Sequence, residues 1–243
     1  MRRRDLLRAA ALFPAAAWLP RAGILAARGA EVPLSRQFSD DEAYWAEIRR
    51  QFLITGGIFM NTGTWGALPV PVLEALEAHM RAFETVFHQA PFDVHALRAQ
   101  LATLVGAPPE SLAFTRNTTE GMNVVARGLD FQPGDEILLT THEHVGGRCC
   151  WELVAARHGL VLRQFPPPVP APSEDALFEA WTSQVGPRTR VLSVQHVFFS
   201  TGAIQPVQRL AAWARERGII TVVDGAHPPG MLAVDIQGLG CDF

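Results

Sequence analysis

The stretch that decides the fold is Ile219-Ile220-Thr221-Val222-Val223-Asp224-Gly225-Ala226-His227. Its apolar, β-branched beginning predicts a buried strand, which ends abruptly in a carboxylate, a glycine and a histidine. Open α/β sheets bind their ligands at the carboxyl ends of the strands. At such a strand end, Asp224 is either a loop residue whose charge is costly to bury or the partner of a cationic group.

Upstream of this stretch, predicted strands and helices alternate along the chain. Strands are predicted at residues 111–115, 136–140, 160–165 and 189–194, and helices at 119–127, 147–158, 174–185 and 206–217. Earlier in the chain, helices are predicted at 38–52, 71–87 and 95–105. Strands that alternate with helices of about ten to fifteen residues indicate βαβ units. The expected fold class is therefore α/β with a mostly parallel sheet.

Length and composition narrow the class of protein further. With 243 residues, of which 48% are hydrophobic, the chain can bury a sizeable core. A net charge of −3 gives no electrostatic footprint for nucleic acid. Three cysteines are too few for a disulfide framework and have no zinc-site spacing, so buried thiols and no metal are expected. All 21 basic residues are arginines, which a biased genome would also produce.

Residues 1–30 have the pattern of an export signal. Three arginines at 2–4 form a charged beginning, and an alanine-rich apolar stretch follows at 9–19. That stretch is too short for a permanent membrane span and is interrupted by Pro14. Residues 3–8, Arg-Arg-Asp-Leu-Leu-Arg, resemble the twin-arginine pattern. An ordinary secretory signal or a basic amphipathic helix is the alternative. We expect export to the periplasm or another extracytoplasmic location.

A predicted strand-to-helix junction lies at residues 114–121, Phe-Thr-Arg-Asn-Thr-Thr-Glu-Gly. Thr118 and Thr119 stand at the helix start, where unpaired backbone N–H groups and the helix dipole favour a phosphate. The same residues also fit plain capping, with Asn117 as the cap and Glu120 three residues later. The pattern alone leaves both interpretations open.

Histidines follow two other predicted strands. Residues 140–144 read Thr-Thr-His-Glu-His, which fits a metal-binding fragment, a ring that stacks on a flat ligand, or an ordinary loop. His196 follows the strand at 189–194 and fits a core histidine. Because parallel strands end at one edge of the sheet, threonine, histidine and aspartate groups are expected there together. Anion donors, a flat ring partner and a carboxylate suit a phosphorylated pyridine.

The chain resembles the class V aminotransferase family of fold-type I pyridoxal-phosphate (PLP) enzymes, which includes isopenicillin N epimerase-like proteins and cysteine desulfurases. The resemblance runs from about Phe38 to Phe243. The stretches that carry it are Asn61–Gly66, Asn117–Gly121, Glu143–His144, Ser193–Pro206 and Asp224–His227. It implies a three-layer αβα fold, the large PLP-binding domain of these enzymes, in incomplete form.

The resemblance also implies roles for five residues. Thr118 and Thr119 would hold the phosphate, His144 would stack on the pyridine ring, Asp224 would pair with the ring nitrogen, and His227 would lie near the phenolic oxygen. Phe199 stands where desulfurases commonly have an asparagine, which favours the epimerase-like branch.

The family's Schiff-base lysine lies beyond the aspartate motif, but only 19 residues follow Asp224 and none is a lysine. The chain is therefore expected to be a fragment without a catalytic residue of its own. Its expected parts are a signal (1–30), an N-terminal segment (31–75) and a partial PLP-binding domain (76–243).

The resemblance implies that the full-length protein acts on an amino acid through a Schiff base and forms a homodimer. A cysteine desulfurase is the rival enzyme. A non-catalytic exported protein that binds an anion at the start of the 119–127 helix is the rival of another class.

Overall fold

The computed structural model describes residues 42–63, 66–85 and 93–243. The expected export signal at 1–30 lies outside the described residues. The chain divides into two compact units, one of residues 1–57 and 67–88 and one of residues 58–66 and 89–243. The boundaries expected after residues 30 and 75 stay predictions. Within the described ranges, no helix combines the length and apolar character needed to cross a membrane.

The first unit contains helices α2 (Glu42–Arg50) and α3 (Val70–Thr85), as expected. The predicted extensions at 38–41 and 86–87 lie outside the described residues. Helix α2 has an acidic first turn and a basic last turn, which complements the helix dipole. The backbone N–H of Val70 donates to the carbonyl of Gln51 and thereby links the two helices.

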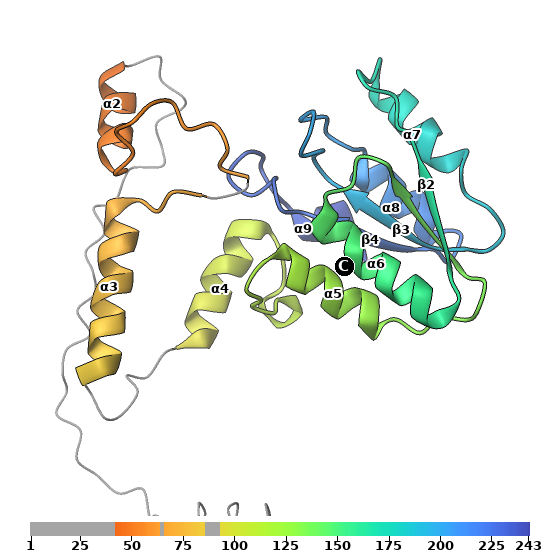
Figure 1. Cartoon of the computed structure of the whole chain (residues 1–243), viewed down its shortest axis with the longest axis horizontal. Coiled ribbons are helices and arrows are strands. Elements are labelled where there is room, and N and C mark those ends of the chain that lie inside the picture. Colours follow the sequence, from red (N-terminus) through yellow and green to blue (C-terminus); the bar gives the residue numbers. More distant parts are fainter. Residues whose placement is uncertain (1–41, 64–65, 86–92) are drawn as a thin grey trace, which may run out of the picture. The chain divides into compact units, whose positions relative to one another are not determined.

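The second unit, in which Figure 1 labels strands β2, β3 and β4, is built on a parallel sheet in the order β2-β1-β3-β4. The strands are β1 (Glu136–Thr140), β2 (Val161–Phe165), β3 (Thr189–Gln195) and β4 (Ile220–Asp224), and every pairing is parallel. Beside β4, the Phe243 N–H donates to Thr221 O and the Val223 N–H donates to Phe243 O. This is the bonding pattern of a parallel ladder, which places the backbone of Phe243 along the free edge of β4. The expected α/β class is confirmed.

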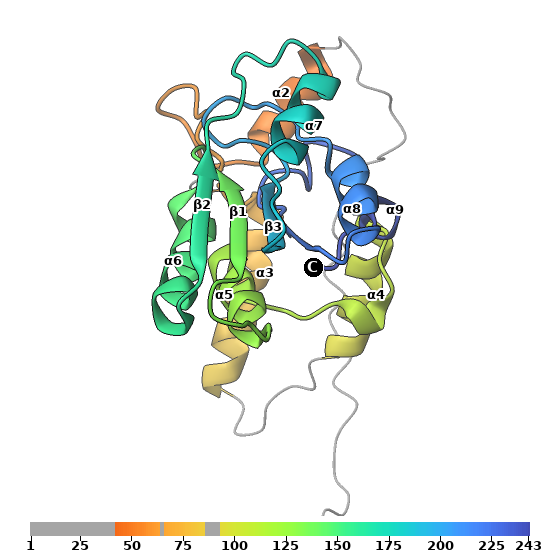
Figure 2. The same cartoon turned by 90° about the vertical axis from the view of Figure 1, so that its right-hand side faces the viewer.

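Helices cover both faces of this sheet (Figure 2). Helices α5 (Thr118–Gly128) and α6 (Val145–His158) pack on one face with Ile137 and Leu139, and α8 (Val207–Arg215) and α7 (Glu174–Thr182) pack on the other with Leu138 and Leu192. The strands read as continuous apolar runs because both of their faces are buried. The three-layer αβα arrangement expected from the resemblance is confirmed.

A buried tryptophan fixes each outer layer. Trp151 of α6 donates its indole N–H to Ser193 Oγ at 2.8 Å, and Trp181 of α7 donates to Gln205 Oε1 at 3.0 Å. Both rings are almost completely buried. Satisfying the indole N–H lets the large apolar ring contribute its burial free energy without the cost of an unpaired donor.

At the edges of the fold one prediction is wrong, and one element was not predicted. Residues 111–115 form no strand: a 3-10 turn (Pro109–Ser111) precedes them, and the extended backbone that follows pairs with no strand in the described part of the chain. Phe114 is 45% exposed there, so the apolar pattern did not reflect burial. Helix α9 (Ile236–Leu239), capped by Asp235, was not expected because it has a single turn.

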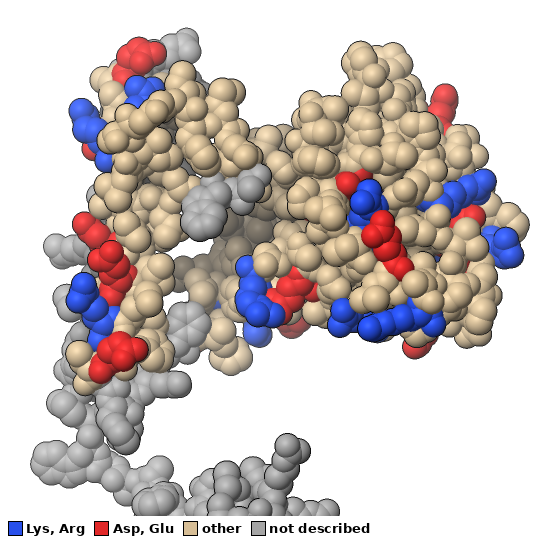
Figure 3. Space-filling view, in the orientation of Figure 1, with Lys and Arg blue, Asp and Glu red and all other residues tan. Residues whose placement is uncertain are grey.

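The remaining helices agree with expectation to within a turn. Helix α4 (Val94–Val105) begins at the cap Asp93 and ends at Gly106, which has φ 64°. Helices α7 and α8 end earlier than predicted, and α6 begins two residues earlier. Acidic and basic side chains are interspersed on the face shown in Figure 3, and ion pairs such as Arg148–Glu152 bring the two signs together.

Candidate active site

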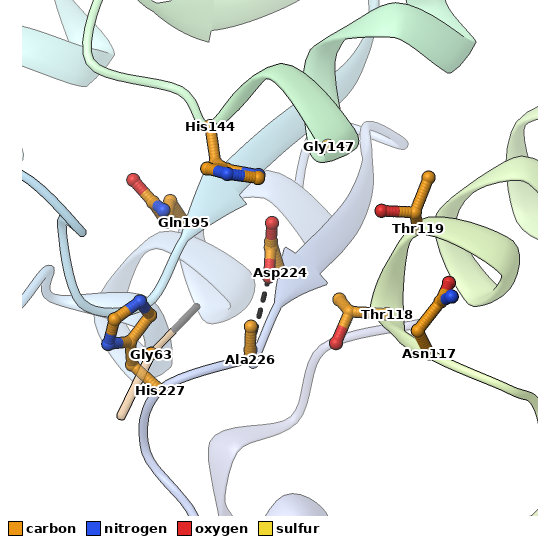
Figure 4. A pocket seen from close by; sticks show the side chains of 10 residues that line it. All are labelled: Gly63, Asn117, Thr118, Thr119, His144, Gly147, Gln195, Asp224, Ala226 and His227. Carbon is orange, nitrogen blue, oxygen red and sulfur yellow. Dashed lines mark hydrogen bonds between the residues drawn. The ribbon is translucent and has the colours of Figure 1, made fainter. Parts of the chain in front are cut away.

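The carboxyl ends of β1, β3 and β4 meet the start of α5 around a pocket of about 260 Å³ (Figure 4). Its lining consists of Gly63, Asn117, Thr118, Thr119, His144, Gly147, Gln195, Asp224, Ala226 and His227. All five residues that the resemblance selected as cofactor ligands are in this set. The structure therefore brings the predicted site residues together; their roles toward a cofactor stay predictions.

The start of α5 forms one wall of the pocket. Asn117 Oδ1 accepts from the Glu120 N–H at 2.9 Å and caps the helix. The Glu120 carboxylate accepts from the Arg116 N–H at 2.6 Å and pairs with the Arg116 guanidinium, which lowers the pKa of Glu120. Capping and pocket lining are thus compatible, because Asn117 caps while Thr118 and Thr119 line the pocket beside it (Figure 4).

His144 ends the loop after β1 and caps α6. Its Nδ1 accepts from the Gly146 N–H at 3.1 Å, which fixes the orientation of the ring at the start of α6. The ring also contacts Phe199 edge-on, with centroids 5.1 Å apart. Phe199 therefore supports His144 from outside the pocket. The β3 residue that lines the pocket is Gln195, which the sequence did not single out.

Asp224 lies at the end of β4 and is 3% exposed. Its Oδ1 accepts from the Ala226 N–H at 3.1 Å. Burial raises the pKa of the carboxyl, while that hydrogen bond, His144 and His227 lower it. No ion pair to Asp224 occurs among the described residues. A buried carboxylate of this kind is stabilised most by a cationic group that enters the pocket.

His227 is held against the backbone of the 61–66 motif. A Cβ placed on Gly63 would lie 2.7 Å from His227 Cε1, so a larger residue at this position would require the imidazole to shift. Thr64 and Trp65 of the same motif lie outside the described residues. Gly63 was noted in the sequence only as part of the 61–66 motif, and the structure adds that it lies close to the imidazole of His227.

A second carboxyl, Glu143, is buried behind the pocket and is 5% exposed. Its Oε1 accepts from Thr140 Oγ1 at 3.1 Å, and Oε2 has no hydrogen-bond partner among the described residues. Burial, with the nearby charge of Asp224 as a smaller contribution, raises the pKa of Glu143 to about 8. Glu143 is consequently largely protonated at neutral pH. From the sequence, Glu143 was named only as part of a possible metal-binding fragment and as the neighbour of His144.

The other highlighted residues lie outside the pocket. His142 packs against Phe198, with ring centroids 5.3 Å apart. His196 is half-buried beside β4, where its backbone N–H donates to the backbone carbonyl of Asp224. In the described ranges, no group of three or more His, Cys, Asp or Glu residues is placed to hold a metal ion. The three cysteines are free thiols, and Cys150 is buried, as expected for this residue type.

Comparison with known proteins places this geometry in a family. Residues 72–243, more than half of the chain, match the family model described as aminotransferase class-V. The chain belongs to the class V aminotransferase family. It is 42% identical over 207 residues to isopenicillin N epimerase of Amycolatopsis lactamdurans, an alignment that covers 82% of this chain and 52% of that protein.

Other relatives of this class V aminotransferase chain include desulfurases. A probable cysteine desulfurase of Pseudomonas aeruginosa is 35% identical over 205 residues, which cover 79% of this chain and 50% of that protein. A solved structure of a C-DES variant with glycine covalently linked to its PLP cofactor has a TM-score of 0.68 and 30% identity, covering 80% of this chain and 53% of that one. The chain spans about half the length of the relatives that it matches.

Proposed function

We propose that the full-length protein is a PLP-dependent enzyme of the isopenicillin N epimerase-like branch that acts on an amino acid through a Schiff base. The observation that carries the proposal is Asp224, a buried carboxylate at a strand end with no ion-pair partner among the described residues. It faces a pocket whose opposite wall is the start of α5 (Figure 4). The identity to isopenicillin N epimerases supports the branch.

The residues present fit pyridoxal 5′-phosphate. The hydroxyls of Thr118 and Thr119 and the first N–H groups of α5 would bind the phosphate. The ring of His144 would lie against the pyridine face, and His227 would approach the phenolic oxygen. Bound PLP supplies an electron sink for a carbanion formed at the α-carbon of the substrate.

Asp224 would hold the proton on the pyridine nitrogen. Its Oδ1 is engaged by the Ala226 N–H, which leaves Oδ2 for the cofactor. A protonated pyridine and an ionised carboxylate compensate each other's charge in a buried place. This requires Asp224, rather than Glu143, to carry the negative charge, and the raised pKa of Glu143 keeps that neighbour neutral.

The 243 residues contain no lysine, so we propose that this chain alone is inactive and that the Schiff-base lysine belongs to the part of the relatives that it does not match. The rival function is cysteine desulfurase, favoured by the desulfurases among the relatives and solved structures. Phe199, which contacts His144 instead of lining the pocket, favours the epimerase-like reading.

The test uses the full-length protein purified with added PLP. We expect stoichiometric cofactor with visible absorbance, and exchange of the α-hydrogen of amino acid substrates with solvent deuterium. Inversion at the α-carbon, followed by chiral chromatography, supports an epimerase, whereas release of sulfide from cysteine supports a desulfurase. A protein that binds the phosphate of PLP without developing the visible band would be an anion-binding protein, and the proposal would fail.

We also propose export through a twin-arginine signal and a homodimeric full-length enzyme. The motive for export is the Arg-Arg-Asp-Leu-Leu stretch at residues 3–7. Replacing Arg3 and Arg4 with lysines keeps the charge, which an ordinary secretory signal tolerates, but removes the guanidinium groups. We expect the double variant to stay in the cytoplasm, loaded with cofactor. Unchanged delivery, measured by cell fractionation, would contradict the proposal; light scattering tests the dimer.

A further inference from the structure

The first turn of helix α6 contains two successive glycines, Gly146 and Gly147, which follow the cap His144 and the first helical residue Val145. Glycine destabilises a helix relative to alanine, because its backbone loses more conformational freedom on folding. Neither glycine has a left-handed φ that would explain its presence. Both are buried, so the reason for the pair lies in what packs against it.

Gly147 lies directly against the carboxylate of Asp224. A Cβ at this position would be 2.8 Å from Asp224 Oδ2 and 3.7 Å from its Cγ. The carboxylate cannot readily turn away, because Oδ1 is held by the Ala226 N–H and the side chain is buried. A methyl group at residue 147 would therefore displace the oxygen that is free for a ligand.

Gly146 makes the same kind of contact with two other pocket groups. A Cβ here would overlap Thr119 Oγ1 and would lie 3.1 Å from His144 Nδ1. By contrast, Gly121 and Gly128 in α5 leave room for a methyl group: the nearest atom to a Cβ at Gly121 is 3.8 Å away, and none lies within 4 Å at Gly128. Close approach thus distinguishes the two glycines of α6 from the two glycines of α5.

We propose that Gly147 is a positioning residue of the cofactor site, whose missing side chain keeps Asp224 Oδ2 free to face a cationic ring nitrogen. Gly146 does the same for Thr119 and His144. The inference rests on the proposed function, since it assigns the free carboxylate oxygen to the PLP ring. It adds a residue whose contribution is steric and acts through Asp224.

The first test compares Gly147→Ala with Gly128→Ala in the full-length protein. Titration of each apoprotein with PLP, followed by absorbance, gives the Kd. Overpacking of this kind predicts a Kd raised by about ten- to a hundredfold for Gly147→Ala. Gly128→Ala should bind as wild type does. Equal Kd values for wild type and Gly147→Ala would overturn the inference; failure of wild type to bind PLP would instead overturn the proposed function.

A double-mutant cycle separates positioning from a general defect in α6. In an Asp224→Ala background the carboxylate is gone, so adding Gly147→Ala should change the Kd less than twofold. The same fold-change in both backgrounds would mean that Gly147 acts independently of Asp224, which refutes the inference. Should Gly147→Ala alone fail to fold by circular dichroism, the double variant is expected to fold, and its failure to do so would equally refute the inference.

Discussion

The two helices that border the pocket begin in opposite ways. Helix α5 begins with polar side chains: Asn117 caps it, and Thr118 and Thr119 line the pocket. Helix α6 is capped by His144 and has two glycines in its first turn, which let Asp224 and Thr119 approach its backbone. One helix start provides groups and the other provides space. The difference teaches that a binding site depends on side chains that are absent as much as on those that are present.

Asp224 lies in the pocket that both helix starts border, and of all the substitutions considered its replacement should lower catalysis most. Asp224→Ala in the full-length enzyme should lower kcat/KM by an amount on the order of 3–5 kcal/mol in transition-state free energy, since one partner of a buried charge pair is removed. Exposed Asp130 is the matched control, and Asp130→Ala should leave kcat/KM unchanged. Turnover near that of wild type, with cofactor bound, would contradict the role given to Asp224.

A substitution of Glu143 tests whether this carboxyl, next to Asp224, is protonated in the folded protein. Its folded pKa of about 8 lies above the ordinary value of 4.5, so between these pH values the unfolded chain binds fewer protons than the folded one. The contribution of the protonated carboxyl is complete below pH 4.5 and is lost as pH rises toward 8. Glu143→Gln cannot lose a proton.

The glutamine variant should therefore gain stability relative to wild type as pH rises from 5 to 8, by on the order of a few kcal/mol. Urea unfolding of both proteins across this range, each without cofactor, measures the difference. Parallel stability curves for the two proteins would show that Glu143 is ionised in the folded state.

Removal of a hydroxyl at the start of α5 should have a smaller effect than replacement of either carboxyl. Thr118→Val and Thr119→Val keep the shape of the side chain but remove the donor, so each should weaken PLP binding by about tenfold, the value of one hydrogen bond to a charged group. Thr103→Val in α4 is the control, because that hydroxyl bonds to Ala99 O of its own helix. Unchanged cofactor affinity in both variants would show that the phosphate does not bind to these two hydroxyls.

The smallest effect is expected from the cap itself. Asn117→Ala removes the bond to the Glu120 N–H and should lower the free energy of unfolding by about 1 kcal/mol. Thermal melting of the apoprotein measures it, and Ser173→Ala, which removes the equivalent cap of α7, should cost a similar amount. A larger loss for Asn117 in the presence of PLP than in its absence would reveal a contact with the cofactor as well.

Much of this site follows from local sequence. The strand ends at Thr140 and Asp224 and the cap at Asn117 are recognisable because periodicity and capping act over a few residues. The prediction of a strand at 111–115 was wrong because it too relied on a local apolar pattern. A strand also needs a partner from elsewhere in the chain, which local sequence does not reveal. Gln195 and Glu143 were not assigned roles, because burial at a strand end has no sequence signature of its own.

The family resemblance selected the five residues as cofactor ligands, whereas the sequence by itself determined the α/β class and most of the order of strands and helices. These depend on residue type and spacing along the chain. Only the tertiary structure decided that Gly147 lies against Asp224 and Gly63 against His227, and that Glu143 is buried beside a second carboxyl. Such contacts join residues far apart in the chain, and their energies depend on distance and desolvation, which exist only once the sheet has brought the strand ends together.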